Sequence, residues 1–456
     1  MRFIILLFLP FLVQGAWRAT NNVNTYAGNI TYNEDWGYTT VRTGAHSFWW
    51  LYSAAQTSND RPLFLWLQGG PGSSGVGFGN FEETGPKDLN ENDNPATWLQ
   101  KGDLVYVDNP VGTGFSYVDN VNAYTTDVAQ IGQDLLTWMI DFLKQHPEYK
   151  TRPFFIVCES YGGKMTAEFA KTLYQAIQSG VVSMTAFKGI GLGDSWISPM
   201  DFVNTWGPYL YAQSYLDDQQ LAQVNKQALK CQSLVNRSQW SDATDCWSET
   251  ESLIGFVTGG VSWYNVLKES DQDDWSMKKT QIAPMRSAIK KLYKTHVAPF
   301  HGDKMNDYMN TVARKKLGII PDSVKFGGQS SWVFDYQSAD FMKPNWDTVD
   351  LLLNYGLQVT VFNGQLDLIC DTMGSEKWVN RLKWSGLTKW QQVDKQPFET
   401  KNFPLAGYTK TYKNLQFIWI LRAGHMNSRF HFNDGGTEEK KKMSHSAVQS
   451  IGTDVC

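Results

Sequence analysis

Residues 154–164 read FFIVCESYGGK, and this stretch decides the fold of the chain. Its first four residues are an apolar run typical of a buried strand, and a helical pattern begins at Lys164. Ser160 therefore lies in a tight turn between a strand and a helix, which pushes its hydroxyl above the edge of the sheet. The N-terminus of the following helix offers free backbone N–H groups to a developing oxyanion there. Ser160 is the predicted nucleophile.

Such a turn leaves little room for neighbouring side chains. Gly162 meets this need on the helix side, whereas Cys158 stands where the usual pattern has glycine. Short strings of serine and glycine also occur in ordinary turns, so the assignment depends on partners elsewhere in the sequence.

The chain begins with the outline of a secretory signal peptide over residues 1–15. A basic start is followed by an apolar run, 3–13, that is too short to span a bilayer. No later stretch is long and apolar enough for a membrane helix, so we expect a secreted or lysosomal protein without a membrane anchor. Sequons at Asn29 and Asn236 then predict glycosylation in accessible loops. The net charge of −4 gives no reason to expect nucleic acid as a partner.

Five cysteines are too few to carry the fold, yet an oxidising compartment favours a local pairing. Cys231 and Cys246 flank a polar segment and are the predicted disulfide. Cys158 and Cys370 are expected to be buried free thiols, because cysteine packs as a small apolar group. Cys456 is left over.

Strands and helices alternate along the chain, which predicts an α/β protein with a mostly parallel central sheet flanked by helices. An early hairpin is expected over 36–42 and 47–53, and a helix over 128–142 after a cap at Thr126. Short apolar runs predict buried strands at 63–67, 104–107, 154–157, 359–362 and 417–421.

Residues 201–317 differ from the rest of the chain in their sequence pattern, with long polar helical stretches at 217–232 and 286–294. We interpret them as a helical cap inserted between two parts of the core, 16–200 and 318–426, although a separate second domain is the alternative. Ligands of open α/β sheets bind at the carboxyl edge of the strands, so a cap there would shape substrate choice. The tail, 427–456, is polar and atypical for a core element.

A serine nucleophile needs a base, and the base needs an anion to orient it. Asp367 and His425 each follow a predicted strand, so both belong at the carboxyl edge of the sheet beside Ser160. The order Ser, Asp, His is the order of α/β-hydrolases. The remaining histidines are assigned to a turn, a helix end and the surface: His46, His146, His296, His301, His431 and His445.

The oxyanion hole requires backbone N–H groups from two places. One is the residue after the nucleophile, Tyr161. The second is expected from the glycine-rich loop 66–74, with Gly70 as the donor. This loop could also cradle a phosphate, but it lacks the Gly-Lys-Ser/Thr ending and a suitable following helix.

Five motifs in order, 66–74, 81–86, 108–117, 159–163 and the surroundings of Asp367 and His425, make the chain resemble the serine carboxypeptidases of the α/β-hydrolase fold. The resemblance implies that Ser160, Asp367 and His425 form the catalytic triad. It also implies a serine-type carboxypeptidase, a hydrolase that removes residues from the C-termini of peptides or proteins through an acyl-enzyme. Nothing in the sequence suggests a metal or an organic cofactor.

The resemblance further implies a site for the terminal carboxylate of the substrate, built from Gln68, Gly69, Glu83 and Glu159. Two close carboxyl groups cannot both ionise cheaply, so one keeps a proton and can donate it to that carboxylate. We therefore expect activity to peak at mildly acidic pH, where His425 is still partly neutral.

The sequence departs from the family pattern at several positions. Gln68 replaces an asparagine, Ser73 replaces a common cysteine, and Met426-Asn427-Ser428 replaces the usual Met-Val-Pro after the histidine. A loosely held base loses its reactive geometry, so activity could be weakened. Two alternative functions follow: an impaired homologue that binds or protects a partner, or an esterase or acyltransferase with the same triad. The oligomeric state is open, with a homodimer as one option.

Overall fold

The computed structural model describes residues 18–27, 30–56, 58–268, 303–327, 330–400 and 403–427. The signal peptide, the sequon at Asn29, the stretch 286–294, Cys456 and the tail beyond Asn427 lie outside these residues. The histidines at 296, 301, 431 and 445 lie outside them as well.

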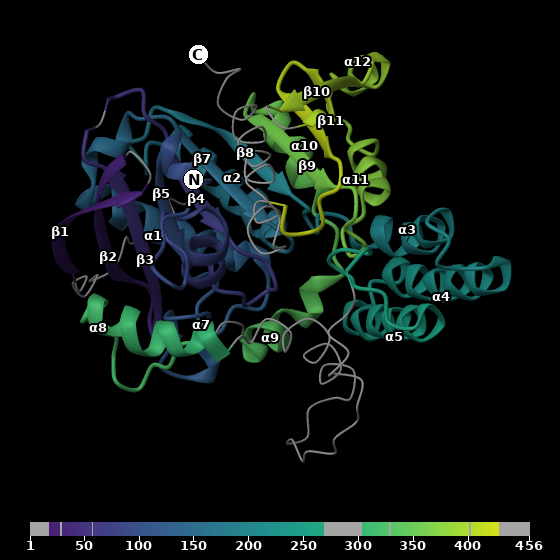
Figure 1. Ribbon diagram of the computed structural model, residues 1–456, viewed down its shortest axis with the longest axis horizontal. Helices are drawn as coiled ribbons and strands as arrows, with labels where there is room; N and C mark the ends of the chain where they lie inside the picture. Colours follow the sequence, from purple (N-terminus) through teal and green to yellow (C-terminus); the bar gives the residue numbers. More distant parts are fainter. Residues whose placement is uncertain are drawn as a thin grey trace, which may run out of the picture.

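A single sheet runs through the described part of the chain (Figure 1). Its spatial order is β1-β2-β3-β5-β4-β7-β8-β9-β12-β11-β10, with β6 paired to β3. The strands are β1 (Arg18–Ala27), β2 (Ile30–Arg42), β3 (Ala45–Ala54), β4 (Leu63–Leu67), β5 (Asp103–Val107), β6 (Tyr117–Val118), β7 (Phe154–Glu159), β8 (Phe187–Gly193), β9 (Gln358–Gly364), β10 (Gln396–Thr400), β11 (Phe403–Tyr412) and β12 (Leu415–Ile420).

The centre of the sheet is parallel and its two sides are antiparallel. Strands β5, β4, β7, β8, β9 and β12 run parallel to one another, and β5 pairs antiparallel with β3. The hairpin β2–β3 and the hairpins among β10, β11 and β12 pair antiparallel. All five predicted central strands and the early hairpin are confirmed. The placement of His46 in a turn is wrong, because this residue lies on β3 and pairs with Thr40.

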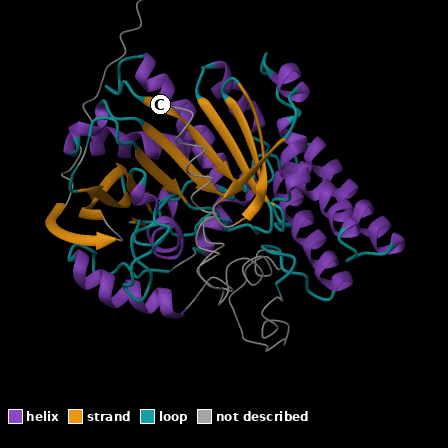
Figure 2. Ribbon diagram, turned by 45° about the horizontal axis from the view of Figure 1, so that its top comes forward, coloured by secondary structure: helices purple, strands orange, loops and turns teal. Residues whose placement is uncertain are grey.

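Helices cover both faces of the sheet (Figure 2). They are α1 (Val128–Gln145), α2 (Gly162–Gln178), α9 (Ser331–Phe341), α10 (Trp346–Asn354), α11 (Thr372–Val379) and α12 (Leu387–Gln392), with short helical turns η1 (Gly75–Thr84), η2 (Trp98–Gln100), η3 (Val121–Ala123) and η4 (Pro147–Lys150). The cap of α1 is Asp127, whose carboxylate accepts a 2.8 Å hydrogen bond from Gln130 N, rather than the predicted Thr126. A carboxylate at this position also interacts well with the positive end of the helix dipole.

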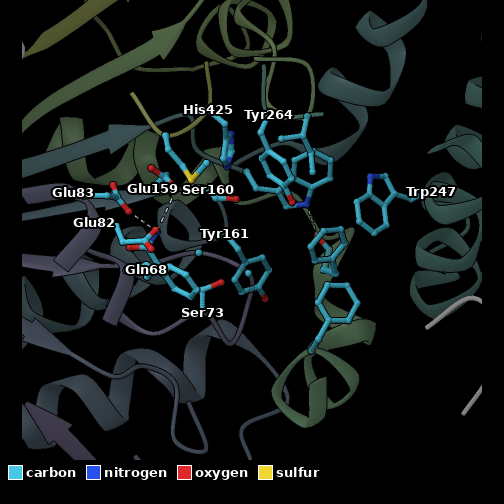
Figure 3. A pocket seen from close by; sticks show the side chains of 18 residues that line it. Gln68, Ser73, Glu82, Glu83, Glu159, Ser160, Tyr161, Trp247, Tyr264 and His425 are labelled. Atoms are coloured by element: carbon cyan, nitrogen blue, oxygen red, sulfur yellow. Dashed lines mark hydrogen bonds between the residues drawn. The ribbon is translucent and has the colours of Figure 1, made fainter. Parts of the chain in front are cut away.

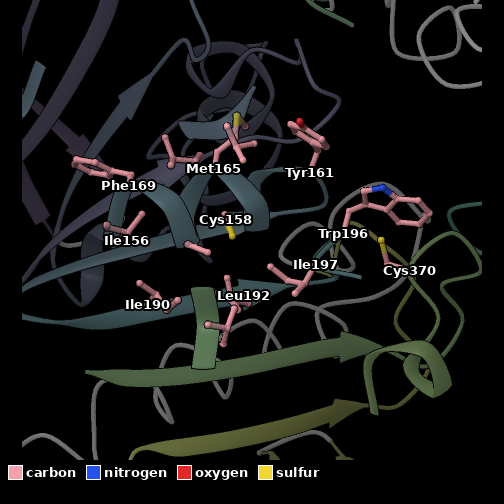
Figure 4. Packing of buried hydrophobic residues seen from close by; sticks show 14 of the residues in the cluster. Ile156, Cys158, Tyr161, Met165, Phe169, Ile190, Leu192, Trp196, Ile197 and Cys370 are labelled. Carbon is pink, nitrogen blue, oxygen red and sulfur yellow. The ribbon is translucent and has the colours of Figure 1, made fainter. Parts of the chain in front are cut away.

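Because side chains alternate along a strand, each central strand contributes to two cores. On β7, Ile156 packs with Met165 and Leu192 on one face (Figure 4). Val157 and Phe155 pack on the opposite face with residues such as Phe78. Because these strands are buried on both faces, their sequences are continuous apolar runs.

The region predicted as a cap, 201–317, is helical over most of its described residues. Its helices form two groups that lie at different places on the molecule. Helices α3 (Pro199–Ala212), α4 (Asp218–Asn236) and α5 (Trp240–Thr258) stack at one end of the molecule (Figure 1). Helix α7 (Asp303–Tyr308), η8 (Met309–Ala313) and α8 (Arg314–Leu317) pack near β2 instead, where Trp36 Nε1 donates to Leu317 O at 2.9 Å. The predicted domain boundaries remain a prediction.

The predicted disulfide is present and joins α4 to α5 through Cys231 and Cys246, with their Cα atoms 5.5 Å apart. Cys158 and Cys370 are buried and free, as expected. Asn236, the last residue of α4, is exposed, which is compatible with a sequon. Among the helices of the described ranges, none combines the length and the apolar character needed to cross a membrane.

Candidate active site

Ser160 sits in a strained turn between β7 and α2. Its φ of 60° lies in the left-handed region that side-chain-bearing residues rarely adopt. Two glycines make this turn possible. A Cβ on Gly69 would lie 2.5 Å from Ser160 Cβ, and a Cβ on Gly162 would lie 2.6 Å from Leu67 O. The glycine-rich loop can therefore approach the serine closely only because it carries no side chain there.

Asp367 follows β9 and His425 follows β12, so neighbouring parallel strands deliver both to the same edge of the sheet. Asp367 Oδ2 and His425 Nδ1 are 2.8 Å apart, and both side chains are buried. This contact favours a proton on Nδ1 of the imidazole and leaves Nε2 to act as a base. The backbone N–H of His425 donates to Tyr264 O at 2.8 Å, which anchors the loop.

Ser160 and His425 line the same cavity (Figure 3). In the described part of the chain no direct hydrogen bond joins them, but such bonds are often long in unliganded enzymes and tighten when substrate binds. The structure thus brings the three sequence-predicted residues to one place, with the carboxylate–imidazole contact already formed.

The two predicted oxyanion donors, Gly70 and Tyr161, line this cavity as well. Tyr161 is the N-cap of α2, so its backbone N–H is among the donors that a helix leaves free at its start. The side-chain hydroxyl of Tyr161 donates a 3.0 Å hydrogen bond to Asp340 Oδ2 on α9.

Asp108 anchors the glycine-rich loop 66–74, which carries the predicted oxyanion donor Gly70. It accepts hydrogen bonds from Ser74 Oγ at 2.5 Å, Val76 N at 3.2 Å and Phe115 N at 2.8 Å. Burial raises the pKa of Asp108 to about 7, partly offset by these hydrogen bonds. The π-helix η1 directly follows the loop and was not expected from the sequence. These contacts hold the loop in a chain that has Ser73 in place of the family's common cysteine.

The predicted carboxylate-binding residues meet at the other end of the cavity (Figure 3). Gln68 Nε2 donates to Glu83 Oε1 at 3.0 Å and to Glu159 Oε1 at 3.2 Å, and Trp66 Nε1 donates to Gln68 Oε1 at 2.7 Å. The tryptophan thereby fixes which way the amide points. Burial, followed by the charge of Glu83, raises the pKa of Glu159 well above its ordinary value.

The remaining wall of the cavity is apolar and aromatic. It is formed by Trp196, Trp247, Tyr264, Phe334, Phe341 and Ile369. Trp247 belongs to α5 and Phe341 to α9, and their rings are 4.6 Å apart. Sequence analysis did not identify these residues, because aromatic residues in a helical region indicate a core as readily as a binding surface.

Cys370 completes a cluster with Asp367 and His425, whose potential ligand atoms all lie within 4.8 Å of one another. Asp367 and His425 are hydrogen bonded to each other in this cluster. Burial raises the pKa of the Cys370 thiol well above its ordinary value, which keeps it neutral.

Asp194 was not predicted as a site residue, and Asn427 was noted only as a departure from the family pattern. Asp194 is buried beside Asp367, and Asn427 is buried and hydrogen bonded to Asp194. Asp194 Oδ1 accepts a 3.0 Å hydrogen bond from Asn363 Nδ2, and the amide of Asn427 donates to its other oxygen. The signal that could have found Asp194 is its position directly after β8, a strand that the glycine-rich sequence 187–193 does not reveal.

The sheet, the elbow at Ser160 and the Asp367–His425 contact define an α/β-hydrolase. The serine carboxypeptidase family model matches residues 25–434 of the chain. The retinoid-inducible serine carboxypeptidase of Mus musculus is 46% identical over 398 residues, which cover 86% of this chain and 87% of the relative. Serine carboxypeptidase-like 51 of Arabidopsis thaliana is 40% identical, covering 86% of this chain and 88% of that protein.

Among solved structures, the prohormone-processing carboxypeptidase Kex1 of Saccharomyces cerevisiae has a TM-score of 0.72. It covers 94% of this chain and 92% of its own at 22% identity, which supports the fold alone. The chain belongs to the serine carboxypeptidase family. The predicted family and α/β-hydrolase fold are thus confirmed, as is a serine-type carboxypeptidase activity, with peptides as the class of substrate.

Proposed function

We propose that Ser160, His425 and Asp367 are the catalytic triad and that they release the last residue of a peptide. Ser160 Oγ attacks the carbonyl carbon of the last peptide bond while His425 Nε2 takes the hydroxyl proton. The N–H groups of Gly70 and Tyr161 stabilise the oxyanion. His425 then gives its proton to the departing amine, which leaves as the C-terminal amino acid, and water hydrolyses the acyl-enzyme.

Cleavage at the chain end would follow from the cluster of Gln68, Glu83 and Glu159. The observation that carries the proposal is that Ser160, His425 and this cluster line one cavity, so a terminal carboxylate bound at one end leaves the adjacent peptide bond near the serine. Gly69 lies against Ser160 and Glu159, where an added Cβ would be 2.5 Å from Ser160 Cβ and 3.0 Å from Glu159 O. The protonated member of the carboxyl pair donates a hydrogen bond to the substrate anion.

The proposed working pH is mildly acidic, because the carboxyl pair must keep a proton to bind the terminal carboxylate of the substrate while His425 acts as the base. Together with the predicted signal peptide and the sequon at Asn236, this pH requirement favours the secretory pathway or the lysosome as the location.

The proposal is tested with a fluorophosphonate probe and a pair of peptides that differ only in a free or an amidated C-terminus. We expect the probe to label wild-type protein but not Ser160→Ala, and only the free peptide to lose its last residue. Equal turnover of both peptides would favour the esterase or acyltransferase alternative. An absence of labelling would favour the impaired homologue.

A further inference from the structure

Besides Glu83 and Glu159, the site holds a second pair of carboxyl groups, those of Asp194 and Asp367. Asp194, the residue after β8, is fully buried, and its carboxyl interacts directly with that of Asp367. One oxygen accepts hydrogen bonds from Asn363 Nδ2 at 3.0 Å and Gly364 N at 2.8 Å. The other accepts a hydrogen bond from the side-chain amide of Asn427. Asp194 is therefore tied to the chain segments that carry both Asp367 and His425.

The backbone holds Asp194 in an uncommon conformation. Its φ is 39°, in the left-handed region, and its N–H donates to Phe362 O at 2.9 Å on β9. Such strain persists only where surrounding contacts over-determine the conformation, and it concentrates at functional sites. Here it directs a carboxyl group from the end of β8 toward the loop that follows β9.

Asp194 and Asp367 cannot both be ionised cheaply in this buried position. Burial and the charge of Asp367 raise the pKa of Asp194 well above its ordinary value, partly offset by the bonds from Gly364 and Asn427. The other titratable groups that interact with the pair lie on several elements: Cys370 and Asp371 in the loop after β9, Glu159 at the end of β7, Tyr209 on α3, Tyr264 after α5, and His425. A proton on Asp194 relieves this repulsion and can be donated to Asp367.

Asn427 lies where this chain departs from the family pattern. Its backbone N–H donates to His425 O at 2.9 Å, and its side chain reaches Asp194. The segment directly after the histidine is therefore anchored to the same carboxyl group that supports Asp367, in place of the family's Met-Val-Pro sequence.

On the basis of the function proposed above, we propose that Asp194 is a positioning residue which shares one proton with Asp367 and, together with Asn427, holds the acid–base pair in place. Asp194 does not touch the substrate. It fixes the carboxylate that orients the imidazole, and Asn427 fixes the loop that carries the imidazole. The segment after His425, which departs from the family's sequence, then anchors the base His425 through Asn427.

The test compares Asp194→Ala, Asp194→Asn and Asn427→Ala with wild-type protein across pH. Asp194→Ala is expected to lower kcat by about 10- to 100-fold with little change in KM, because a misplaced base loses reactive geometry. Asp194→Asn is expected to lower kcat by about tenfold at mildly acidic pH, because its amide can donate to Asp367 but its nitrogen cannot accept the hydrogen bond from Asn427. Asn427→Ala is expected to lower kcat by about tenfold.

The pH dependence of kcat separates positioning from general stability. Asparagine cannot lose its amide proton, so the alkaline fall of kcat should move to higher pH in Asp194→Asn. Asp201→Asn is the matched control, since it alters a buried aspartate that pairs with Arg381 and lies outside the cavity. Its melting temperature is expected to fall without a change in the pH profile.

Wild-type kcat in Asp194→Ala would overturn the proposal. If that variant does not fold, an unchanged alkaline limb in Asp194→Asn overturns it instead. Failure of the triad itself would be recognised separately, because Ser160→Ala would then retain peptidase activity.

Discussion

At the scale of single residues, the elbow tolerates a thiol where its usual pattern has glycine. Cys158 is fully buried, and its Sγ lies 3.3 Å from Gly191 O. A Cβ on Gly162 would lie 3.0 Å from Cys158 Cβ, so the space that the thiol occupies is available only because the helix side carries glycine. Burial raises the pKa of Cys158 to about 11, which keeps it an inert thiol beside the nucleophile.

Glu159 allows a test of how the substrate carboxylate is recognised. In Glu159→Gln a neutral amide donor replaces a carboxyl group whose pKa is raised by burial and by Glu83. As pH rises through that raised pKa, wild-type protein loses the proton that faces the substrate anion, whereas glutamine keeps its donor. We expect kcat/KM of Glu159→Gln to persist about one pH unit or more further into the alkaline range.

The measurement is a pH profile of kcat/KM on a peptide with a free C-terminus. Glu168→Gln is a matched control, because Glu168 is also buried, lies on α2 outside the cavity and accepts a 2.8 Å hydrogen bond from Thr348. Superimposable profiles for wild type and Glu159→Gln would contradict the assigned role.

At the scale of elements, the central strands could be predicted because they are short apolar runs buried on both faces. That prediction also placed Asp367 and His425 correctly, since each directly follows such a strand. Strand β8 was missed because glycines alternate through it, and β10 was missed because it is an edge strand with exposed side chains. Because β8 was not predicted, Asp194, which directly follows this strand, was not predicted as a site residue either.

The contacts that complete the site could not be read from the sequence for a different reason. Trp247 and Phe341 come together from α5 and α9, which lie far apart along the chain. Hydrophobic periodicity identifies an apolar helix face but not its partner. Glu83 and Glu159 were paired only by resemblance to the family, because the intervening 75 positions contain no pattern that joins them.

The α4–α5 disulfide permits a prediction about one pair of elements. In the double variant Cys231→Ser, Cys246→Ser, the 15-residue separation loses its covalent closure, which is expected to cost roughly 3 kcal/mol in the free energy of unfolding. Trp247 follows Cys246 directly and lines the cavity, so looser packing of α5 should also raise KM for substrates with large apolar side chains.

Urea unfolding and Michaelis kinetics check the two effects. Val181→Ser, an exposed position away from α4 and α5, is the control and should change neither quantity. An unchanged KM with reduced stability would mean that α5 does not contribute to the substrate site.

At the scale of the whole molecule, the fold concentrates buried carboxyl groups along the carboxyl edge of the sheet. Asp108 follows β5, Glu159 ends β7, Asp194 follows β8, and Asp371 lies in the loop after β9. Burial is the first cause of the raised pKa at each of them. This arrangement couples the stability of the molecule to the acidity of its surroundings.

The sign of that coupling follows from where the protons are bound. Burial raises the pKa of Asp108 to about 7 and that of Asp371 to about 8, whereas an aspartate in the unfolded chain titrates near pH 3.9. Between these values the folded state holds protons that the unfolded state lacks. The free energy of unfolding should therefore fall as pH rises, by up to about 1.4 kcal/mol per pH unit for each such group.

We expect urea unfolding to show a loss of a few kcal/mol between pH 5 and pH 7, because over this range the folded state holds protons that the unfolded state lacks. In Asp371→Asn the free energy of unfolding should depend less steeply on pH, by the contribution of about one proton. Asparagine does not titrate, and it can keep the bonds to Thr205 and Gly374. Asp347→Asn, at an exposed position, should leave the slope unchanged. Stability that rises from pH 5 to pH 8 would mean that these carboxyl groups are ionised in the folded protein, and the acidic working range would lose its structural basis.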